Sequence, residues 1–198
     1  MKLLITGATG YIGRALVAEL IRQNFIISVA VRQKNSLFPN EVKQFVLGGF
    51  ESDPDFSTSL SEVDCIIHLA GNSVVPSSVE NPRYDLEQNI IGTFNFLDSA
   101  KINNVSRFIF ASSGAPAGEV QPPIHEELPA HPVSPYGASK LSCEAYCSAF
   151  YNSFGVETVV LRFSNVYGPN SHHKTSVIAK FISTMLDNEC VELYGDGL

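Results

Sequence analysis

A short apolar run followed by regularly spaced glycines constrains the fold of this chain most strongly. The run covers residues 2–6, and Gly7, Gly10 and Gly13 follow it at intervals of three residues. Beyond the second glycine, apolar residues recur at helical spacing. The pattern predicts a strand, a glycine turn and a helix, which is the context in which a loop cradles phosphate groups.

Each glycine of this turn has its own role in a dinucleotide site. Gly7 permits a tight turn, Gly10 lets backbone N–H groups approach a pyrophosphate, and Gly13 allows close packing of helix on strand. The start of the helix then offers unpaired N–H groups and the positive end of its dipole to the anion. We therefore expect cofactor contacts from Gly7, Thr9, Gly10, Tyr11, Ile12 and Gly13.

The rest of the chain alternates between strand-like apolar runs and helical segments. Further strands are predicted at residues 26–31, 45–47, 64–71, 107–111, 156–163 and 191–194. Helices are predicted between them, among others at residues 82–101, 134–154 and 176–186, and Gly155 closes the second of these. This alternation indicates an α/β fold with a doubly wound parallel sheet of the Rossmann type, layered α/β/α.

The end of the second predicted strand carries Arg32, with Lys34 two residues beyond. A site for NAD usually has an acid at this place, where it binds the ribose hydroxyls. Basic side chains instead suit the 2′-phosphate of NADP, although they are also common in loops as solvated groups. The sequence therefore favours NADP slightly over NAD.

Small and hydroxyl residues end the fourth and fifth predicted strands. Leu69, Ala70 and Gly71 would let the backbone pass close to a bound dinucleotide. The fifth strand ends at Ala111 and runs directly into the hydroxyls of residues 112 and 113. Because doubly wound sheets carry their site groups at the carboxyl ends of the strands, these residues are expected to line a site.

Tyr136 and Lys140 lie four residues apart in a predicted helix that starts with Ser134 as its cap and Pro135 in its first turn. Residues at this spacing share a helix face. A phenol titrates near pH ~10, and a neighbouring ammonium favours the phenolate and lowers that pKa. Tyr136 is therefore a candidate acid/base, although the spacing alone also fits a solvated helix face.

Length and charge narrow the classes of function. The chain has 198 residues, enough for one core, and a formal net charge of -7 without a basic block. Nucleic acid and anionic membranes are therefore not expected as partners. The sequence contains no run of membrane-spanning length and no secretory pattern at its start, so the cytoplasm is the expected location.

The cysteines and histidines are predicted to be structural, and no metal site is expected. Cys143 and Cys147 share a helix face, but no histidine is close in sequence, so packed, reduced thiols are predicted. His68 is expected to be a packed strand residue. The adjacent His172 and His173 do not share a face and are expected to be solvated.

Three separated motifs in this chain occur together in one known family. They are Thr6-Gly7-x-x-Gly10-x-x-Gly13, Ser112-Ser113 and Tyr136-x-x-x-Lys140. The chain thereby resembles the extended short-chain dehydrogenase/reductase family, over its whole length. The phrases Ser134-Pro135-Tyr136-Gly137-x-Ser139-Lys140 and Leu161-Arg162-Phe163-x-Asn165-Val166-Tyr167-Gly168-Pro169 are similar to its nucleotide-sugar epimerase and dehydratase branch, typified by UDP-glucose 4-epimerase.

The resemblance implies roles for individual residues. Ser113 would bind the substrate oxygen, Tyr136 would be the acid/base, and Lys140 would bind the nicotinamide ribose and lower the tyrosine pKa. The implied catalytic residues are thus Ser113, Tyr136 and Lys140. Beyond the glycine turn, the implied cofactor contacts are Arg32, Leu69, Ala70, Gly71, Asn89, Ala111, Tyr136 and Lys140, and the implied substrate contacts are Ser112, Ser113 and Asn165.

The chain departs from the family pattern in several places. Gly48-Gly49 stands where the family has an acid that meets the adenine, and Asn72-Ser73 stands near a usual basic residue. Family members continue past residues 195–197 into a part that covers the substrate. We therefore expect residues 1–198 to form an NAD(P)-binding Rossmann domain and, from about residue 170, the start of a truncated substrate-binding part.

The activity implied by the resemblance is an NAD(P)-dependent nucleotide-sugar epimerase that acts by transient hydride transfer at a sugar carbon. One alternative within the same family is an NADPH-dependent 4-keto-sugar reductase, which Arg32 slightly favours. A dehydratase of the same family is less favoured, because dehydratases usually have an acid pair where this chain has Gly114-Ala115. A non-catalytic dinucleotide-binding regulator is a second alternative. The resemblance also implies a homodimer formed through residues 82–101 and 135–154.

Overall fold

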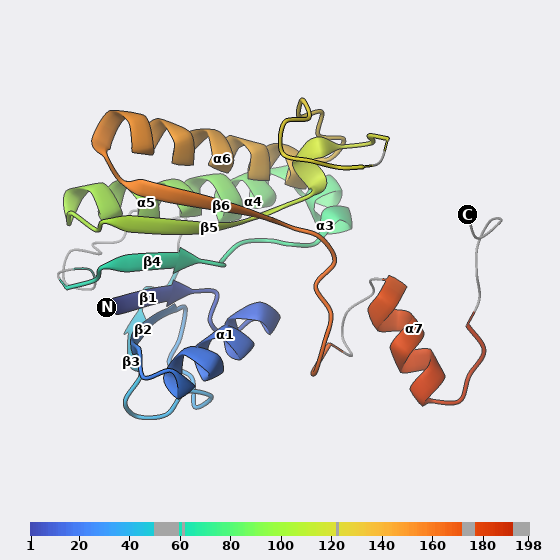
Figure 1. The fold of residues 1–198 in the computed structure, drawn as a ribbon, viewed down its shortest axis with the longest axis horizontal. Helices are drawn as coiled ribbons and strands as arrows, with labels where there is room; N and C mark the ends of the chain where they lie inside the picture. Colours follow the sequence, from blue (N-terminus) through green and yellow to red (C-terminus); the bar gives the residue numbers. More distant parts are fainter. Residues whose placement is uncertain (50–59, 61, 122, 172–176, 192–198) are drawn as a thin grey trace. The chain divides into compact units, whose positions relative to one another are not determined.

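The computed structural model describes residues 1–49, 60, 62–121, 123–171 and 177–191 (Figure 1). The chain divides into two compact units, Met1–Phe163 and Ser164–Leu198. The second unit contains the helix α7 (Val177–Leu186), close to the prediction for residues 176–186. Most of the strand predicted at residues 191–194 lies outside the described residues, as do His172 and His173.

The first unit is built on one parallel sheet with the strand order β3-β2-β1-β4-β5-β6. The strands are β1 (Lys2–Thr6), β2 (Ile26–Val31), β3 (Lys43–Val46), β4 (Cys65–His68), β5 (Arg107–Ser113) and β6 (Glu157–Phe163). The order reverses between β1 and β4, which pair at the centre of the sheet. Doubly wound sheets bind ligands at this reversal, outside the carboxyl ends of the strands. The predicted fold class is confirmed.

Helices flank this sheet in the pattern that the sequence predicts, with three additions. The flanking helices are α1 (Tyr11–Arg22), α3 (Val75–Glu80), α4 (Pro82–Leu86), α5 (Gly92–Ile102) and α6 (Pro135–Phe154). The predicted helix at residues 82–101 is a continuous rod in which a π-helical segment, η1 (Glu87–Ile91), joins α4 to α5. The sequence did not predict α3, η1 or the single 3₁₀ turn η2 (Ala115–Ala117).

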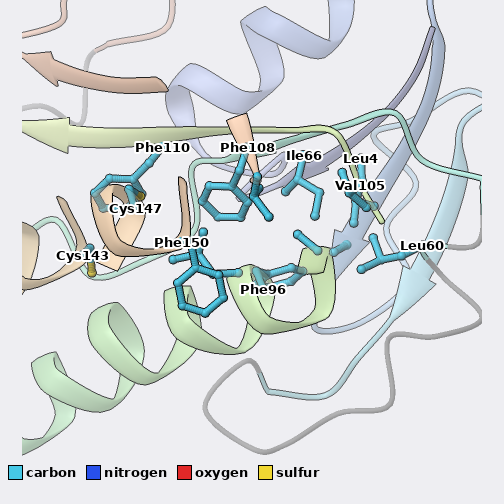
Figure 2. Close-up of a cluster of buried hydrophobic side chains, with 14 residues drawn as sticks. Leu4, Leu60, Ile66, Phe96, Val105, Phe108, Phe110, Cys143, Cys147 and Phe150 are labelled. Carbon is cyan, nitrogen blue, oxygen red and sulfur yellow. The ribbon is translucent and has the colours of Figure 1, made fainter. Parts of the chain in front are cut away.

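Alternate strand residues pack into two separate cores, one on each face of the sheet. Leu4 and Ile66 belong to the core on the side of α5 and α6, whereas Ile5 belongs to the core on the side of α1. Figure 2 shows the first of these cores, in which Phe96 of α5 packs close to Phe108 of β5. Both faces of the sheet are therefore covered, as a parallel sheet requires.

The buried cysteines are free thiols, as predicted. Cys143 and Cys147 of α6 lie in the core of Figure 2, and Cys65 of β4 is also buried. Burial raises the pKa of the Cys147 thiol to about 12 and that of Cys65 to about 11. These side chains therefore remain protonated and pack as small apolar groups.

His68 at the end of β4 is a packed strand residue, as predicted, but it is also hydrogen-bonded on both ring nitrogens. Its Nδ1 lies 2.9 Å from Thr6 Oγ1 and its Nε2 lies 3.2 Å from Thr93 Oγ1. The ring packs 5.0 Å from the ring of Phe96, centroid to centroid. Burial, assisted by the charge of Lys140, lowers the His68 pKa to about 3. The imidazole is therefore neutral and ties β1, β4 and α5 together.

The neutral His68 predicts a particular dependence of stability on pH. The pKa of a histidine in the unfolded chain is about 6.5, so below that pH the unfolded chain binds a proton that the folded chain does not. The free energy of unfolding should fall between pH 6.5 and about 3, by up to roughly 1.4 kcal/mol per pH unit. Urea denaturation at several pH values measures this slope.

Two variants test the assignment of that slope. His68→Gln should remove this share of the pH dependence, because the new side chain does not titrate. His125→Gln changes an exposed histidine and should leave the slope as it is. An identical slope in His68→Gln and the unsubstituted chain would contradict the assignment.

Candidate active site

The predicted catalytic residues come together at the carboxyl end of β5. Tyr136 and Lys140 lie on α6, and Ser113 is the last residue of β5. Lys140 Nζ donates a hydrogen bond of 2.9 Å to the carbonyl oxygen of Ala111, and the Ser113 side chain lies near enough to Tyr136 to act on its pKa. All three side chains therefore reach one place, although they come from segments more than twenty residues apart.

Capping places Tyr136 in the first turn of α6. The Ser134 hydroxyl accepts a hydrogen bond from the backbone N–H of Gly137 at 3.1 Å, and Pro135 occupies the first helical position. The Ser78 hydroxyl of α3 accepts the backbone N–H of Tyr136, also at 3.1 Å. The helix ends at Gly155, which has a φ of 73°. Both predicted ends of the helix are confirmed, and Ser78 is a second cap that the sequence did not predict.

The pKa of Tyr136 shifts in the direction opposite to the prediction. Burial, together with the charge of Asp85, raises the pKa of Tyr136, while the hydrogen bond with Ser113 opposes the rise. Burial lowers the pKa of Lys140. The ammonium does not draw the tyrosine pKa down because it is directed to the Ala111 carbonyl, and Nζ lies 5.9 Å from the centroid of the Tyr136 ring.

The glycine turn brings β1, β4 and α1 into close contact. Gly7 has a φ of +65°, and a β-carbon there would lie 2.6 Å from the Leu69 carbonyl carbon and 2.7 Å from the Ala70 nitrogen. A β-carbon on Gly13 would overlap the Gly7 carbonyl oxygen. The Thr6 hydroxyl accepts the Ala70 N–H at 3.0 Å. The close backbone approach predicted for these glycines is therefore present.

This turn fits the diphosphate of a dinucleotide. Gly10 is the N-cap of α1 and offers no side chain to its first turn. A helix start of this kind, preceded by a glycine turn, presents N–H groups and a dipole to an anion. Thr9, Tyr11 and Ile12 lie at the same turn, where they were predicted to contact the cofactor.

A second group of predicted cofactor residues converges beyond the end of β4. Asn89 lies in the π-helical segment, is 1% exposed, and has an Oδ1 without a hydrogen-bond partner in the described part of the chain. Gly71 has a φ of +148°, and a β-carbon built on it would overlap Asn89 Oδ1 and lie 3.8 Å from Lys140 Nζ. Gly71 thus leaves room for an unpaired acceptor that faces the side of Lys140.

Two predicted site residues of the first unit, Ser112 and Arg32, are not brought to this group. The Ser112 hydroxyl donates a hydrogen bond of 2.5 Å to Glu144, which also forms an ion pair with Arg162 at 2.6 Å. Successive strand residues face opposite sides, so Ser112 braces the sheet against α6 instead of joining Ser113. Arg32 is exposed just beyond the end of β2, and Asn165 belongs to the second unit.

Sequence reasoning missed the buried polar side chains that support the site. Asp85 is fully buried, Ser78 caps α6, and Ser139 binds Asp85. Asp85 precedes Asn89 by four residues, so their spacing in the predicted helix could have indicated that the two side chains are neighbours.

The described residues contain no group of three or more His, Cys, Asp or Glu side chains placed to hold a metal ion. Among their helices, none is long and apolar enough to cross a membrane.

Comparison with known proteins identifies the family of this chain. Residues 3–198 match the model of the NAD dependent epimerase/dehydratase family. The UDP-glucose 4-epimerase of Mycolicibacterium smegmatis is 30% identical, over 100% of this chain and 67% of its own length. A Methanocaldococcus jannaschii relative is 36% identical over 98% of this chain, which spans 66% of that relative's length.

Two solved structures share the fold over the whole of this chain. The UDP-glucose 4-epimerase of Thermotoga maritima, solved with UDP-glucose, has a TM-score of 0.87 and 31% identity, and this chain covers 67% of it. A double mutant of a dTDP-glucose 4,6-dehydratase from Streptomyces venezuelae, solved with NAD, has a TM-score of 0.84 and 28% identity, again with 67% covered.

Proposed function

This chain belongs to the NAD dependent epimerase/dehydratase family, and we propose that it carries the dinucleotide-binding and catalytic part of a nucleotide-sugar 4-epimerase. The observation that carries the proposal is the convergence of Ser113, Tyr136 and Lys140 at the carboxyl end of β5. The glycine turn, which fits a diphosphate, follows β1, and only β4 separates β1 from β5 in the same sheet.

In the proposed reaction the side chains move and hold protons while the hydride passes to and from the cofactor. Ser113 holds the oxygen on the reacting sugar carbon by a hydrogen bond, and Tyr136 Oη exchanges the proton of that oxygen. Lys140 holds the ribose of the dinucleotide. A bound nicotinamide would supply the hydride acceptor and donor for this reaction. The raised pKa of Tyr136 fits the step in which the phenol returns its proton to the sugar oxygen.

We propose NADP as the slightly favoured cofactor because Arg32 follows β2 as an exposed cation. A carboxylate at this place would repel the 2′-phosphate, whereas a guanidinium binds it. The Streptomyces venezuelae dehydratase was solved with NAD. A relative solved with NAD does not decide the cofactor of this chain. The preference for NADP proposed here rests on the charge of Arg32.

Titration of the chain with NADPH and with NADH tests the cofactor proposal. Both should bind saturably, with NADPH the tighter, and Arg32→Ala should reduce the preference for NADPH by about tenfold through loss of a charged contact. Arg22→Ala is a matched control, because Arg22 is an exposed cation in the last turn of α1. Absence of saturable binding by either dinucleotide would contradict the proposed function.

A nucleotide sugar is the proposed substrate, and epimerisation is favoured over reduction and dehydration. The Thermotoga maritima structure contains UDP-glucose, and the Mycolicibacterium smegmatis relative is named for the same reaction. The segment after Ser113 is Gly114-Ala115, which offers no acid pair of the kind that dehydratases use. Product analysis separates the candidates, since epimerisation consumes no cofactor and reduction consumes NADPH stoichiometrically.

Substitution of Tyr136 separates catalysis from cofactor binding. Tyr136→Phe removes the hydroxyl that exchanges the proton but keeps the ring, so turnover of a UDP-sugar should fall by at least about 100-fold. The dissociation constant for the dinucleotide should change little. Unchanged turnover would contradict the role of Tyr136, and loss of dinucleotide binding would indicate a structural role instead. A non-catalytic regulator would show binding in both proteins and turnover in neither.

The surface of α5 and α6 supports a further proposal, that the protein is a homodimer. Phe94 packs edge-to-face on Tyr146 with ring centroids 5.4 Å apart, and both side chains are partly exposed. Phe154, at the end of α6, is 53% exposed. Aromatic side chains at a helix surface are typical of protein interfaces.

The cytoplasm is the proposed location.

A further inference from the structure

Asp85 is a fully buried carboxylate to which the proposed chemistry assigns no role. Its Oδ1 accepts hydrogen bonds from Asn72 Nδ2 at 2.8 Å and from Asn89 Nδ2 at 3.0 Å. Its Oδ2 accepts the Ser139 hydroxyl at 2.6 Å. The three donors come from the loop after β4, the π-helical segment and α6, so Asp85 joins three segments that surround the candidate site.

The carboxylate determines which way the Asn89 amide faces. An ionised carboxylate only accepts hydrogen bonds, so the Asn89 NH₂ group must point to Asp85 and Oδ1 must point away from it. That Oδ1 has no hydrogen-bond partner among the described residues. A β-carbon built on Gly71 would overlap this Oδ1, and the same β-carbon would lie 3.8 Å from Lys140 Nζ. Asp85 therefore holds an acceptor toward the side of Lys140.

The same carboxylate also acts on α6. Ser139 is adjacent to Lys140, so its short bond to Asp85 fixes the helix at the level of the ammonium. Lys140 is 6% exposed, and Glu144 on the same helix is already paired with Arg162. Asp85 takes part in no ion pair within the described residues. It is thus an acid whose charge is available to Lys140.

We propose that Asp85 is a positioning residue for the catalytic pair. Its carboxylate orients the Asn89 amide, anchors α6 through Ser139, and adds a negative charge to the surroundings of the buried Lys140. This inference rests on the function proposed above, in which Lys140 holds the dinucleotide and Tyr136 exchanges a proton.

The electrostatics of the pair agree with this geometry. Burial lowers the pKa of Lys140, and Asp85 is among the groups that oppose the decrease. Burial raises the pKa of Tyr136, and Asp85 adds to the increase. The other groups that act on the pair are Ser113 of β5, His68 of β4, and Cys143, Glu144 and Cys147 of α6. Removal of the Asp85 charge should therefore lower both pKa values.

Asp85→Asn is the variant that removes the charge and preserves the shape. Its amide oxygen can accept from Asn72 and Asn89, and its NH₂ group can donate to the Ser139 hydroxyl. The tyrosinate absorbance of the chain, minus that of the same chain carrying Tyr136→Phe, gives the titration midpoint of Tyr136 without any ligand. This midpoint should fall by about one pH unit in Asp85→Asn.

The matched control is Glu87→Gln, which removes an acid from the same helical rod. Glu87 is partly exposed and paired with Arg83, so its loss should leave the midpoint of Tyr136 in place. The dinucleotide affinity of Asp85→Asn should also begin to fall at a lower pH than in the unsubstituted chain, because Lys140 then loses its proton earlier.

An unchanged Tyr136 midpoint in Asp85→Asn would overturn the proposal, even if the melting temperature fell, since lost stability alone marks a structural role. Asp85→Ser, which keeps one hydroxyl acceptor, replaces Asp85→Asn with the same prediction if the latter does not fold. Failure of the unsubstituted chain to bind dinucleotide would contradict the proposed function instead. The ligand-free titration would still decide the effect of Asp85 on the pair.

Discussion

The structure of the candidate site depends on a lysine ammonium buried in the interior of the chain. A charge removed from water destabilises the folded state unless hydrogen bonds and opposite charge compensate. Lys140 is compensated by the Ala111 carbonyl at 2.9 Å, by the face of the Phe110 ring at 4.7 Å and by the charge of Asp85. These contacts hold α6 over the end of β5, and they thereby place Tyr136 beside Ser113.

A buried histidine, His68, and a buried aspartate, Asp85, lie near this ammonium. His68 is held neutral, partly by the charge of Lys140, and its hydrogen bonds tie the ends of β1 and β4 to α5. Asp85, by contrast, accepts hydrogen bonds from three side chains on its two oxygens. The site therefore has one buried cation and one buried acid near it.

The sequence predicted the features that depend on local pattern. The glycine turn, the limits of α6 and the parallel sheet follow from spacing and capping, and all are present in the structure. The features that were missed depend on tertiary contacts: α3, the Ser78 cap and the Asp85 hydrogen bonds join segments far apart in sequence. The direction of the Tyr136 pKa shift was wrong for the same reason, because neighbouring elements determine how deeply the phenol is buried.

Substitution of Lys140 by methionine tests most directly whether this buried charge serves ligand binding. Methionine keeps an apolar stem and removes the ammonium, which leaves the Ala111 carbonyl without its donor and the Asp85 charge without compensation, so the melting temperature should fall. The affinity for the preferred dinucleotide should fall at least about tenfold, as expected for loss of a hydrogen bond from a charged group. Unchanged affinity would contradict the account. A large loss of stability with unchanged affinity would show that Lys140 serves the fold alone.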